Sequence, residues 1–435
     1  MIHTQNEPKP SFKVGPLFVD TYLRKVSKNG AELPLTDTQF EVFLCLVKRR
    51  GEPVLRKEFG PWLREPLEGD RHPVDDVIKE LRKIVGNDVP IMSARGKGYR
   101  LRPDIPVSDA AGPSVFQSDQ LKAIALDRLN IFTRQSLLTS IEKYEEALGH
   151  GPDAEAYANL ALNYVNQGHT GFCLDVPQHS IPKARALLEE ALRHYPKFSS
   201  AFAIRGLTYA IYENDWTKAD ADLDRAFELN ADDEFAHMVS AHLDVARQRF
   251  DSGIVHARRT AQLDWRTPMS VFTLPWMLVL AGQADEGLQE CEAALKLFGP
   301  FAVGHIVCGY AWDALGVPLK AIEEYEKSIE IADFAEAYGS LGHAYAKAGD
   351  VQAARECLRK LRGVEPLAYV PAYCDALVYV GLGEKDKALD ALETAHSQKC
   401  EWLTFLNVDP RWTPLRRDPR FKTLIRRVGL PTDRP

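Results

Sequence analysis

The chain has 435 residues, of which 45% are hydrophobic and 26% are charged. These fractions are typical of globular proteins, so they exclude a wholly disordered chain, and the length suffices for two or three domains. The net charge of −7 is unevenly divided, because residues 1–102 carry 19 Lys and Arg against 14 Asp and Glu. A basic N-terminal segment followed by an acidic remainder indicates that the N-terminal segment binds a polyanion.

The composition of individual segments argues against two further classes. Residues 1–10 lack the apolar core of a secretory signal, and the most apolar stretch, around 271–281, is only about half as long as a bilayer span. The seven cysteines are odd in number and include no C-x-x-C pair, so we expect reduced thiols and neither a disulfide framework nor a zinc knuckle. We therefore expect a cytoplasmic protein that does not contact a membrane.

The first elements are expected to form a small antiparallel sheet after a flexible N-terminus at residues 1–11. Residues 12–26 are rich in β-forming side chains that alternate loosely along the chain. Asn29-Gly30 favours a tight turn, because both residues tolerate a positive φ. Residues 32–35 are predicted to return as a strand.

Helical spacing predicts two helices after this sheet. A capping box at Thr36 and Gln39 predicts the start of the first helix, whose apolar residues recur at helical spacing up to Val47. A short second helix is expected over residues 57–64, and Pro61 should kink or split it.

A third helix and a hairpin follow. Residues 74–85 have an apolar stripe on one face, and residues 91–94 and 99–101 are predicted strands around a basic tip at 95–98. The charged face of this third helix, with its flanks, carries Asp75, Asp76, Lys79, Glu80, Arg82 and Lys83.

The order of sheet, three helices and hairpin resembles the OmpR/PhoB-type winged-helix effector domain, and residues 12–103 cover its whole length. The motifs behind the resemblance are Leu35-Thr36-x-x-Gln39-Phe40, Val74-Asp75-x-x-Ile78-x-x-Leu81-Arg82 and Arg95-Gly96-x-Gly98-Tyr99-Arg100. The resemblance implies that the helix at 74–85 enters the major groove of double-stranded DNA and that a wing at 93–100 reaches the minor groove. Position by position, it implies DNA contacts by Lys79, Glu80, Arg82, Lys83, Ser93, Arg95 and Lys97.

Two features depart from this family. The family commonly has a basic residue where this chain has Glu80, and Asp76 lies on the same helix. Phosphates repel carboxylates, although a carboxylate can accept a hydrogen bond from cytosine. The family also usually places a phosphoacceptor receiver domain before the winged helix, and we expect none here because the winged helix begins within the first dozen residues.

Beyond an expected linker at residues 104–120, the chain repeats. Similar helix ends recur at intervals of 35, 34, 34 and 34 residues, at Ala191, Ala226, Thr260, Ala294 and Ser328. This period resembles the helix–turn–helix tetratricopeptide (TPR) repeat, and the clearest copy begins at Ala337. We expect about seven repeats in residues 121–400, stacked into a superhelix with an extended concave surface.

Two segments break the period. Thr170–Ser180 is an insertion of about ten residues, expected to be a loop on one face that is either functional or merely tolerated. The stretch from Asn407-Val408-Asp409-Pro410-Arg411-Trp412 to Asp418-Pro419-Arg420-Phe421 resembles the ending of TPR regions in bacterial regulators and some adenylyl cyclases. Residues 401–435 are therefore expected to cap the last repeat with Trp412, Leu415, Phe421 and Ile425. The alternative for this tail is a second anion-binding site built from Arg416, Arg417, Arg420, Arg426 and Arg427.

These features predict a multidomain, mainly α-helical chain with an N-terminal α+β winged helix followed by an all-α TPR solenoid. We expect a one-component transcriptional regulator whose winged helix binds promoter DNA. Its TPR array should bind a protein partner or peptide on the concave surface, bind an effector, or drive self-association into a homo-oligomer. The alternative is an interaction scaffold whose winged helix no longer binds DNA. The sequence contains no phosphate-binding loop, zinc-ligand pair or nucleophile motif, so we expect no cofactor, no metal and no enzymatic activity.

Overall fold

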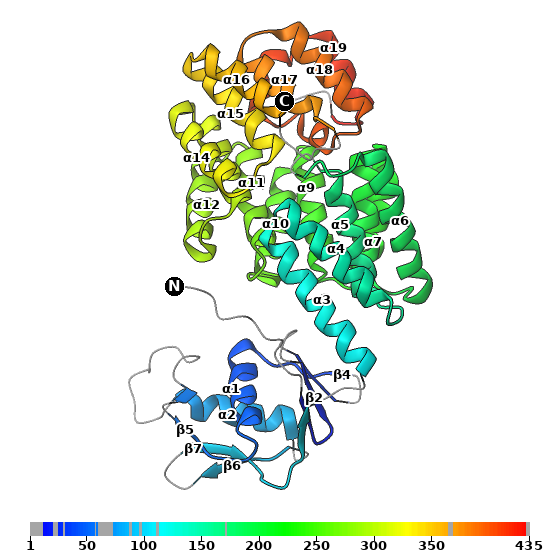
Figure 1. The fold of residues 1–435 in the computed structure, drawn as a ribbon, viewed down its shortest axis with the longest axis vertical. Coiled ribbons are helices and arrows are strands. Elements are labelled where there is room, and N and C mark those ends of the chain that lie inside the picture. The colour runs from blue at the N-terminus through cyan, green and yellow to red at the C-terminus, as the bar shows by residue number, and fades with distance from the viewer. Residues whose placement is uncertain are drawn as a thin grey trace. The chain divides into compact units, whose positions relative to one another are not determined.

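The computed structural model describes residues 12–20, 25–28, 31–56, 58–59, 73–86, 89–94, 98–109, 113–169, 172–363 and 369–431. The chain divides into two compact units, Met1–Ala123 and Ile124–Pro435. Figure 1 shows sheets with the helices α1 and α2 in the first unit and layers of helices in the second. None of the helices in the described segments combines the length and the apolar composition that crossing a bilayer requires.

A five-stranded antiparallel sheet of order β4-β3-β2-β1-β8 forms one side of the first unit. Its strands are β1 (Phe12–Val14), β2 (Leu17–Asp20), β3 (Lys25–Lys28), β4 (Ala31–Glu32) and β8 (Val107–Asp109). The strand predicted over residues 32–35 is therefore shorter than expected. The chain leaves the sheet early because Leu35 donates its backbone N–H to the carbonyl of Leu33, in a local turn just before the first helix.

The remaining elements of the first unit match the predicted winged helix. They are α1 (Asp37–Lys48), α2 (Pro73–Val85) and a three-stranded sheet of order β5-β7-β6, made of β5 (Val54–Leu55), β6 (Ile91–Ala94) and β7 (Gly98–Leu101). The predicted capping box is present, since the Thr36 backbone donates to Gln39 Oε1 and the Gln39 backbone donates to Thr36 Oγ1. The predicted second helix at 57–64 falls mostly outside the described residues.

One hydrophobic core joins the two helices to both sheets of this unit. The apolar stripe of α1 contributes Phe40, Phe43 and Val47, all at most 1% exposed, and α2 contributes Ile78 and Leu81. The buried residues of α2 lie on one face of the helix, and its opposite face is exposed.

The segment predicted as a linker, residues 104–120, contains regular elements in the part that the structure describes. Val107–Asp109 forms β8, which pairs with β1, and α3 (Pro113–Ile131) begins a few residues later. Proline at the first helical position explains the start of α3, because it lacks the N–H that would be unsatisfied there. The mixture of Pro, Ser and Gly that indicated a linker therefore contains a strand and a helix start.

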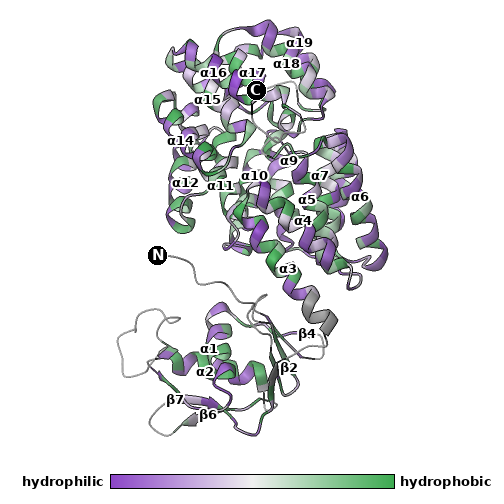
Figure 2. Cartoon of the chain, in the orientation of Figure 1, coloured by the Kyte–Doolittle hydropathy of each residue, from purple (hydrophilic) through white to green (hydrophobic). Residues whose placement is uncertain are grey.

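After α4 (Arg134–Leu148), the second unit consists of successive helix pairs, as the 34-residue period predicted. Within the described residues the pairs are α5 (Ala154–Gln167) and α6 (Pro177–His194), α7 (Ser199–Thr208) and α8 (Trp216–Leu229), α9 (Glu234–Ala246) and α10 (Phe250–Leu263), α11 (Pro268–Leu280) and α12 (Ala284–Phe298), α13 (Ala302–Ala314) and α14 (Pro318–Ile331), α15 (Ala335–Ala348) and α16 (Val351–Leu361), and α17 (Ala372–Gly381) and α18 (Lys385–Ser397). A π-helical turn, η3 (Tyr209–Glu213), lies between α7 and α8. Figure 2 shows hydrophilic and hydrophobic residues interspersed along these helices.

Small residues set the spacing between helices of neighbouring repeats. A Cβ atom at Gly342 in α15 would overlap Val378 of α17 and press on Cys357 of α16, so glycine allows both helices to approach. Leu341 on the same turn is 4% exposed and fills the space between repeats. These are the roles that the predicted repeat signature assigns to its small and large positions.

The insertion at Thr170–Ser180 is part of the core in its described portion, which begins at Phe172. The Phe172 ring lies 4.8 Å from that of Phe132 and 5.5 Å from that of Phe334, which precedes α15. Arg134 in α4 donates to the carbonyls of Phe172 and Asp333, and the Tyr369 hydroxyl donates to the carbonyl of Gly168 at 2.7 Å. The first repeat therefore contacts the sixth and seventh, and the insertion connects the two ends of the array.

Candidate nucleic-acid interface and the concave face of the repeats

The candidate DNA-reading surface is the charged face of α2. Val74, Ile78, Leu81 and Val85 of this helix are at most 2% exposed. On the opposite side, Asp76, Lys79, Glu80 and Lys83 are exposed. The structure thus brings together on one helix face three of the residues that the resemblance marked for DNA contact, Lys79, Glu80 and Lys83.

The charges on this face partly cancel. Lys83 Nζ lies 2.7 Å from Glu80 Oε1, one helical turn apart, with both side chains about half exposed. Such a surface pair stabilises a helix by only about 0.2–0.5 kcal/mol, so either partner can be drawn away by a ligand. Lys79 has no ion pair with any residue in the described part of the chain, and it is the most available cation on the helix.

Arg82, for which the resemblance implied a DNA contact, is bonded to the wing strands in this structure. Its Nε donates to the Ile91 carbonyl at 2.9 Å, and its Nη2 donates to Ser93 Oγ at 3.2 Å. Its guanidinium also lies 5.6 Å from the centre of the Tyr99 ring. Arg82 and Ser93, both predicted to touch DNA, are thus bonded to each other and fix α2 against the strands β6 and β7.

A second link between α2 and the wing strands was not foreseen from the sequence. Asp75 Oδ1 accepts hydrogen bonds from Arg56 Nε at 2.9 Å and from the Tyr99 hydroxyl at 2.7 Å. Burial raises the pKa of Tyr99, and the hydrogen bond to Asp75 raises it further. The hydrogen bond to Asp75 also raises the pKa of Arg56. The sequence indicated only that Tyr99 is part of the core. It could not indicate the hydrogen bond from the Tyr99 hydroxyl to Asp75, because the two residues are 24 positions apart.

The wing hairpin is confirmed by its strands, which pair antiparallel with Ala94 opposite Gly98. Gly98 is required at this position, because its φ is +146° and a Cβ atom would overlap the carbonyl oxygen of Val54 in β5. The predicted contacts Arg95 and Lys97 lie outside the described residues.

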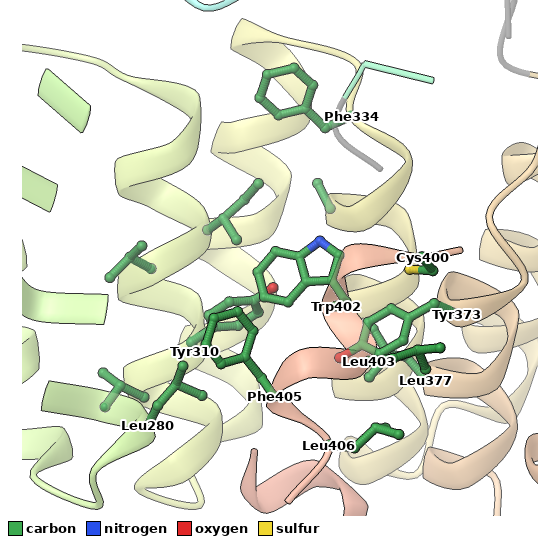
Figure 3. Close-up of a cluster of buried hydrophobic side chains, with 14 of the residues drawn as sticks. Leu280, Tyr310, Phe334, Tyr373, Leu377, Cys400, Trp402, Leu403, Phe405 and Leu406 are labelled. Atoms are coloured by element: carbon green, nitrogen blue, oxygen red, sulfur yellow. The ribbon is translucent and has the colours of Figure 1, made fainter. Parts of the chain in front are cut away.

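The second candidate surface is the concave face of the repeats, which the first helix of each pair lines. The C-terminal tail lies on it. Trp402, in η4 (Glu401–Phe405), has ring centres 5.1 Å from Trp276 in α11, 6.0 Å from Tyr310 in α13 and 6.0 Å from Tyr373 in α17. Figure 3 shows Trp402 and Phe405 on the tail between the helices that carry Tyr310 and Tyr373.

A buried ion pair fixes the tail at its centre. Arg411, in η5 (Pro410–Leu415), is 7% exposed and pairs with Asp409, with 2.6 Å between Nη2 and Oδ2. Its Nη1 donates to Ser340 Oγ in α15 at 2.9 Å, and its guanidinium lies 4.2 Å from the centre of the Tyr310 ring. A buried pair with this many partners holds its geometry, since loss of one partner would leave a charge in a low-dielectric interior.

The final helix of the tail is α19 (Pro419–Arg427), which contacts α18 of the last repeat. The predicted cap residues Trp412, Leu415, Phe421 and Ile425 are all at most 3% exposed, but the tail extends further than a cap. The Trp216 indole N–H in α8 donates to the Val428 carbonyl at 2.8 Å. The tail therefore spans from the second repeat to the seventh.

Two arginines of the tail pair with carboxylates of α18. Arg420 pairs with Asp390 at 2.5 Å and Arg427 pairs with Glu393 at 2.6 Å. Arg416 donates to the backbone carbonyl of Asp409 at 3.3 Å. These contacts favour the structural role of the tail over the alternative of an anion-binding site.

Comparison with known proteins agrees with the division into two units. The family model described as "Transcriptional regulatory protein, C terminal" matches residues 30–101. The transcriptional regulatory protein AfsQ1 of Streptomyces coelicolor is 36% identical over 106 residues, which are 23% of this chain and 46% of that protein. The probable transcriptional regulatory protein SilR of Salmonella typhimurium is 34% identical over 95 residues, 20% of this chain and 42% of that protein. The chain spans less than half the length of these curated relatives.

Among solved structures, the Cut9–Hcn1 hetero-tetramer of APC/C is similar, with a TM-score of 0.50 at 15% identity over 72% of this chain and 55% of that one. A tetratricopeptide repeat protein of Parabacteroides merdae gives a TM-score of 0.41 at 14% identity, over 61% of this chain and 99% of that one. The first unit thus contains an OmpR/PhoB-type winged-helix domain, and the helical remainder has a TPR-like solenoid fold.

Proposed function

We propose that this protein is a transcription regulator in which α2 enters the major groove of promoter DNA while β6 and β7 hold a wing against the minor groove. The observation that carries the proposal is the exposed polar face of α2 on a helix whose other face is buried. A helix held in this way can enter a groove about 12 Å wide without losing its core contacts. The likeness of residues 30–101 to transcriptional regulators supports the same function.

The residues of this surface divide into two classes. Lys79 and Lys83 neutralise phosphates, and Glu80 accepts a hydrogen bond from a base edge such as cytosine N4. Arg82 positions the wing strands through Ile91 and Ser93. Arg95 and Lys97 extend the proposed wing contact into residues outside the described segments.

Two carboxylates and two ammonium groups share the exposed face of α2, so its net attraction for phosphates is weak. Each neutralised phosphate contributes about 0.9 to the slope of log K against log salt. We therefore expect α2 itself to contribute a slope of about one or two, and base contacts to supply much of the specificity.

The experiment is selection of duplexes from a random library by the purified full-length protein, followed by salt titration of the selected duplex. Lys79→Ala should weaken binding to selected and unrelated duplexes alike and reduce the salt slope by about one. Lys13→Ala is the matched control, because Lys13 is an exposed lysine on β1 in the other sheet. Failure to select any duplex sequence would overturn the proposal.

A scaffold that binds only proteins is the second candidate function, and Asp76 and Glu80 on α2 favour it. It would be supported if chromatin precipitation enriched no promoter while the chain remained in a stable protein complex. For either function, we propose that the repeat unit binds its partner, effector or second copy on surfaces that the tail leaves uncovered. The contacts of Trp402 and Arg411 support this, because a peptide on the same part of the concave face would have to displace them.

A further inference from the structure

The exposed face of α3 carries two large apolar side chains. Ile124 is 40% exposed and Ile131 is 46% exposed. Residues seven positions apart lie about 20° from each other around a helix, so both side chains lie on the same face. The opposite face is packed, since Ala125 and Leu129 are at most 8% exposed and belong to the core of the repeat unit. We call Ile124 and Ile131 the α3 stripe.

Two residues of opposite charge flank the α3 stripe. Asp127 and Arg128 lie between the two isoleucines along the helix, about 50° to either side of the line that joins them, and both are exposed. Adjacent residues of a helix do not face each other, and no charged residue lies three or four positions from either one. Within the described residues, neither side chain forms an ion pair. On α3 itself, then, neither charge has a partner of opposite sign.

This face is complementary to itself in one orientation. When two copies of a helix pair in parallel about a two-fold axis along their length, a residue to the left of the contact line faces a residue to the right of that line on the other copy. Asp127 of each copy then faces Arg128 of the other, and each isoleucine of the α3 stripe meets its own copy. In an antiparallel pair each charged residue would face its own copy instead, which brings two carboxylates together and two guanidinium groups together.

We propose that a second copy of this chain binds along the α3 stripe, in parallel and in register. Removal of the isoleucines from water favours the association, and the two crossed pairs of Asp127 with Arg128 fix its orientation. A partner that is acidic or basic throughout fits less well, because this face carries one charge of each sign. A contact of one helix per chain is smaller than the roughly 800 Å² per partner of a stable interface, so the dimer forms reversibly and depends on concentration.

The pairing selects the second copy among the ligands proposed above for the repeat unit. The winged-helix domain precedes α3 in the chain, so a parallel pair brings two such domains to the same end. Two DNA-reading domains that act together on neighbouring half-sites require this. That consequence rests on the proposed DNA binding, whereas the pairing itself does not.

The test is sedimentation velocity of the full-length protein over a concentration series without DNA. Asp127→Arg alone and Arg128→Asp alone should each raise the dissociation constant of the dimer by about tenfold or more, because like charges then face each other. An equimolar mixture of the two variants should dimerise as tightly as the unmodified chain, since every crossed pair again joins opposite charges. Lys360→Asp is the matched control for Arg128→Asp, because Lys360 is an exposed cation on α16, and it should leave the dimer unchanged.

A second measurement tests the parallel register. Ile131→Cys should form a disulfide between the two introduced cysteines under mild oxidation, because the parallel pair places this position beside its own copy. In an antiparallel pair Ile131 would lie beside Ile124 of the other copy, and this single variant would not cross-link. Leu319→Cys is the control, because Leu319 is an exposed apolar residue on α14 and should remain unlinked.

Three results would overturn the proposal. One is a monomer at every concentration, as expected if the winged-helix domain of the same chain covers the α3 stripe. The others are an unchanged dissociation constant in both charge variants, and cross-linking of Ile131→Cys no faster than that of Leu319→Cys. Failure to select a duplex by a protein that still dimerises would contradict the proposed DNA binding and leave the pairing supported.

Discussion

The exposed face of α2 and the concave face of the repeats are the two surfaces that the sequence marks for ligands, and they differ in availability. The face of α2 carries Lys79 and the weakly paired Lys83, both exposed. Part of the concave face is covered by the tail, through Trp402 and Arg411. A motif therefore identifies a surface type, whereas the contacts of distant segments decide whether that surface can bind anything.

The largest expected effect tests whether the tail is fixed on the concave face. Arg411→Met removes the cation and leaves Asp409 buried without it, so the free energy of unfolding of the repeat unit should fall by about 3–5 kcal/mol. Urea unfolding followed by circular dichroism measures this change. Arg420→Met, which breaks only the exposed pair with Asp390, should cost at most about 1 kcal/mol. Equal effects of the two variants would mean that the tail is loosely attached.

The next effect tests the wing that supports α2. Gly98→Ala should destabilise the first unit by about 2–3 kcal/mol, because the methyl group meets the Val54 carbonyl and the residue has a positive φ. Thermal unfolding measures it. Gly86→Ala is the control, since Gly86 also has a positive φ but a Cβ atom there meets nothing, so only about 1 kcal/mol should be lost. A Gly98→Ala variant as stable as the control would contradict the close approach of β5 and β7.

A smaller effect concerns the pH dependence of the covered face. Burial lowers the pKa of His242, whose ring lies 6.2 Å from that of Phe405 on the tail, to about 4. The unfolded chain then binds this proton more readily, so stability is complete above the ordinary histidine pKa of about 6.5 and falls as the pH drops towards 4. At pH 5 the loss relative to pH 7 should be about 2 kcal/mol.

His242→Phe should remove this part of the pH dependence, and urea midpoints at pH 5 and pH 7 measure the difference between variant and unmodified chain. His179→Phe is the control, because His179 is a largely exposed histidine at the start of α6. If His242→Phe and the unmodified chain lost the same stability on acidification, His242 would be exposed to solvent and the tail would not cover it.

The smallest effect sharpens the account of α2. Glu80→Gln removes an acid and releases Lys83 from its ion pair, so binding to an unrelated duplex should strengthen by about 0.5–1 kcal/mol. Fluorescence anisotropy at low salt measures this affinity. Glu32→Gln, at an exposed pair with Lys25 on the other sheet, should leave it unchanged. Unchanged affinity in Glu80→Gln would place α2 away from the phosphates.

Much of the fold was predictable because its signals are local. Thr36 and Gln39 form the expected capping box three residues apart, and the 34-residue period recurs as helix pairs. The path of the tail was not predictable, since the bond from Trp216 to Val428 joins residues 212 positions apart. The burial of Phe172 was not predictable either, because its partners Phe132 and Phe334 are also distant in the sequence.

The candidate site was predicted less completely than the fold. The sequence placed Lys79, Glu80 and Lys83 correctly on one helix face, because helical spacing alone determines that face. The sequence did not distinguish Arg82 from these three residues, because all four are charged residues on α2. The hydrogen bonds of Arg82 to Ile91 and Ser93 are visible only in the structure. Side chains that bridge two elements need the tertiary structure before a role can be assigned.

Hydrogen–deuterium exchange of the full-length protein, with and without a duplex selected from the random library, tests the central claim most directly. We predict that the backbone amides of residues 401–415 are protected in the free protein and unchanged by DNA. We predict that the amides of α2 become protected only when the duplex is added. Rapid exchange of residues 401–415 in the free protein, or unchanged exchange of α2 on adding the duplex, would contradict the account.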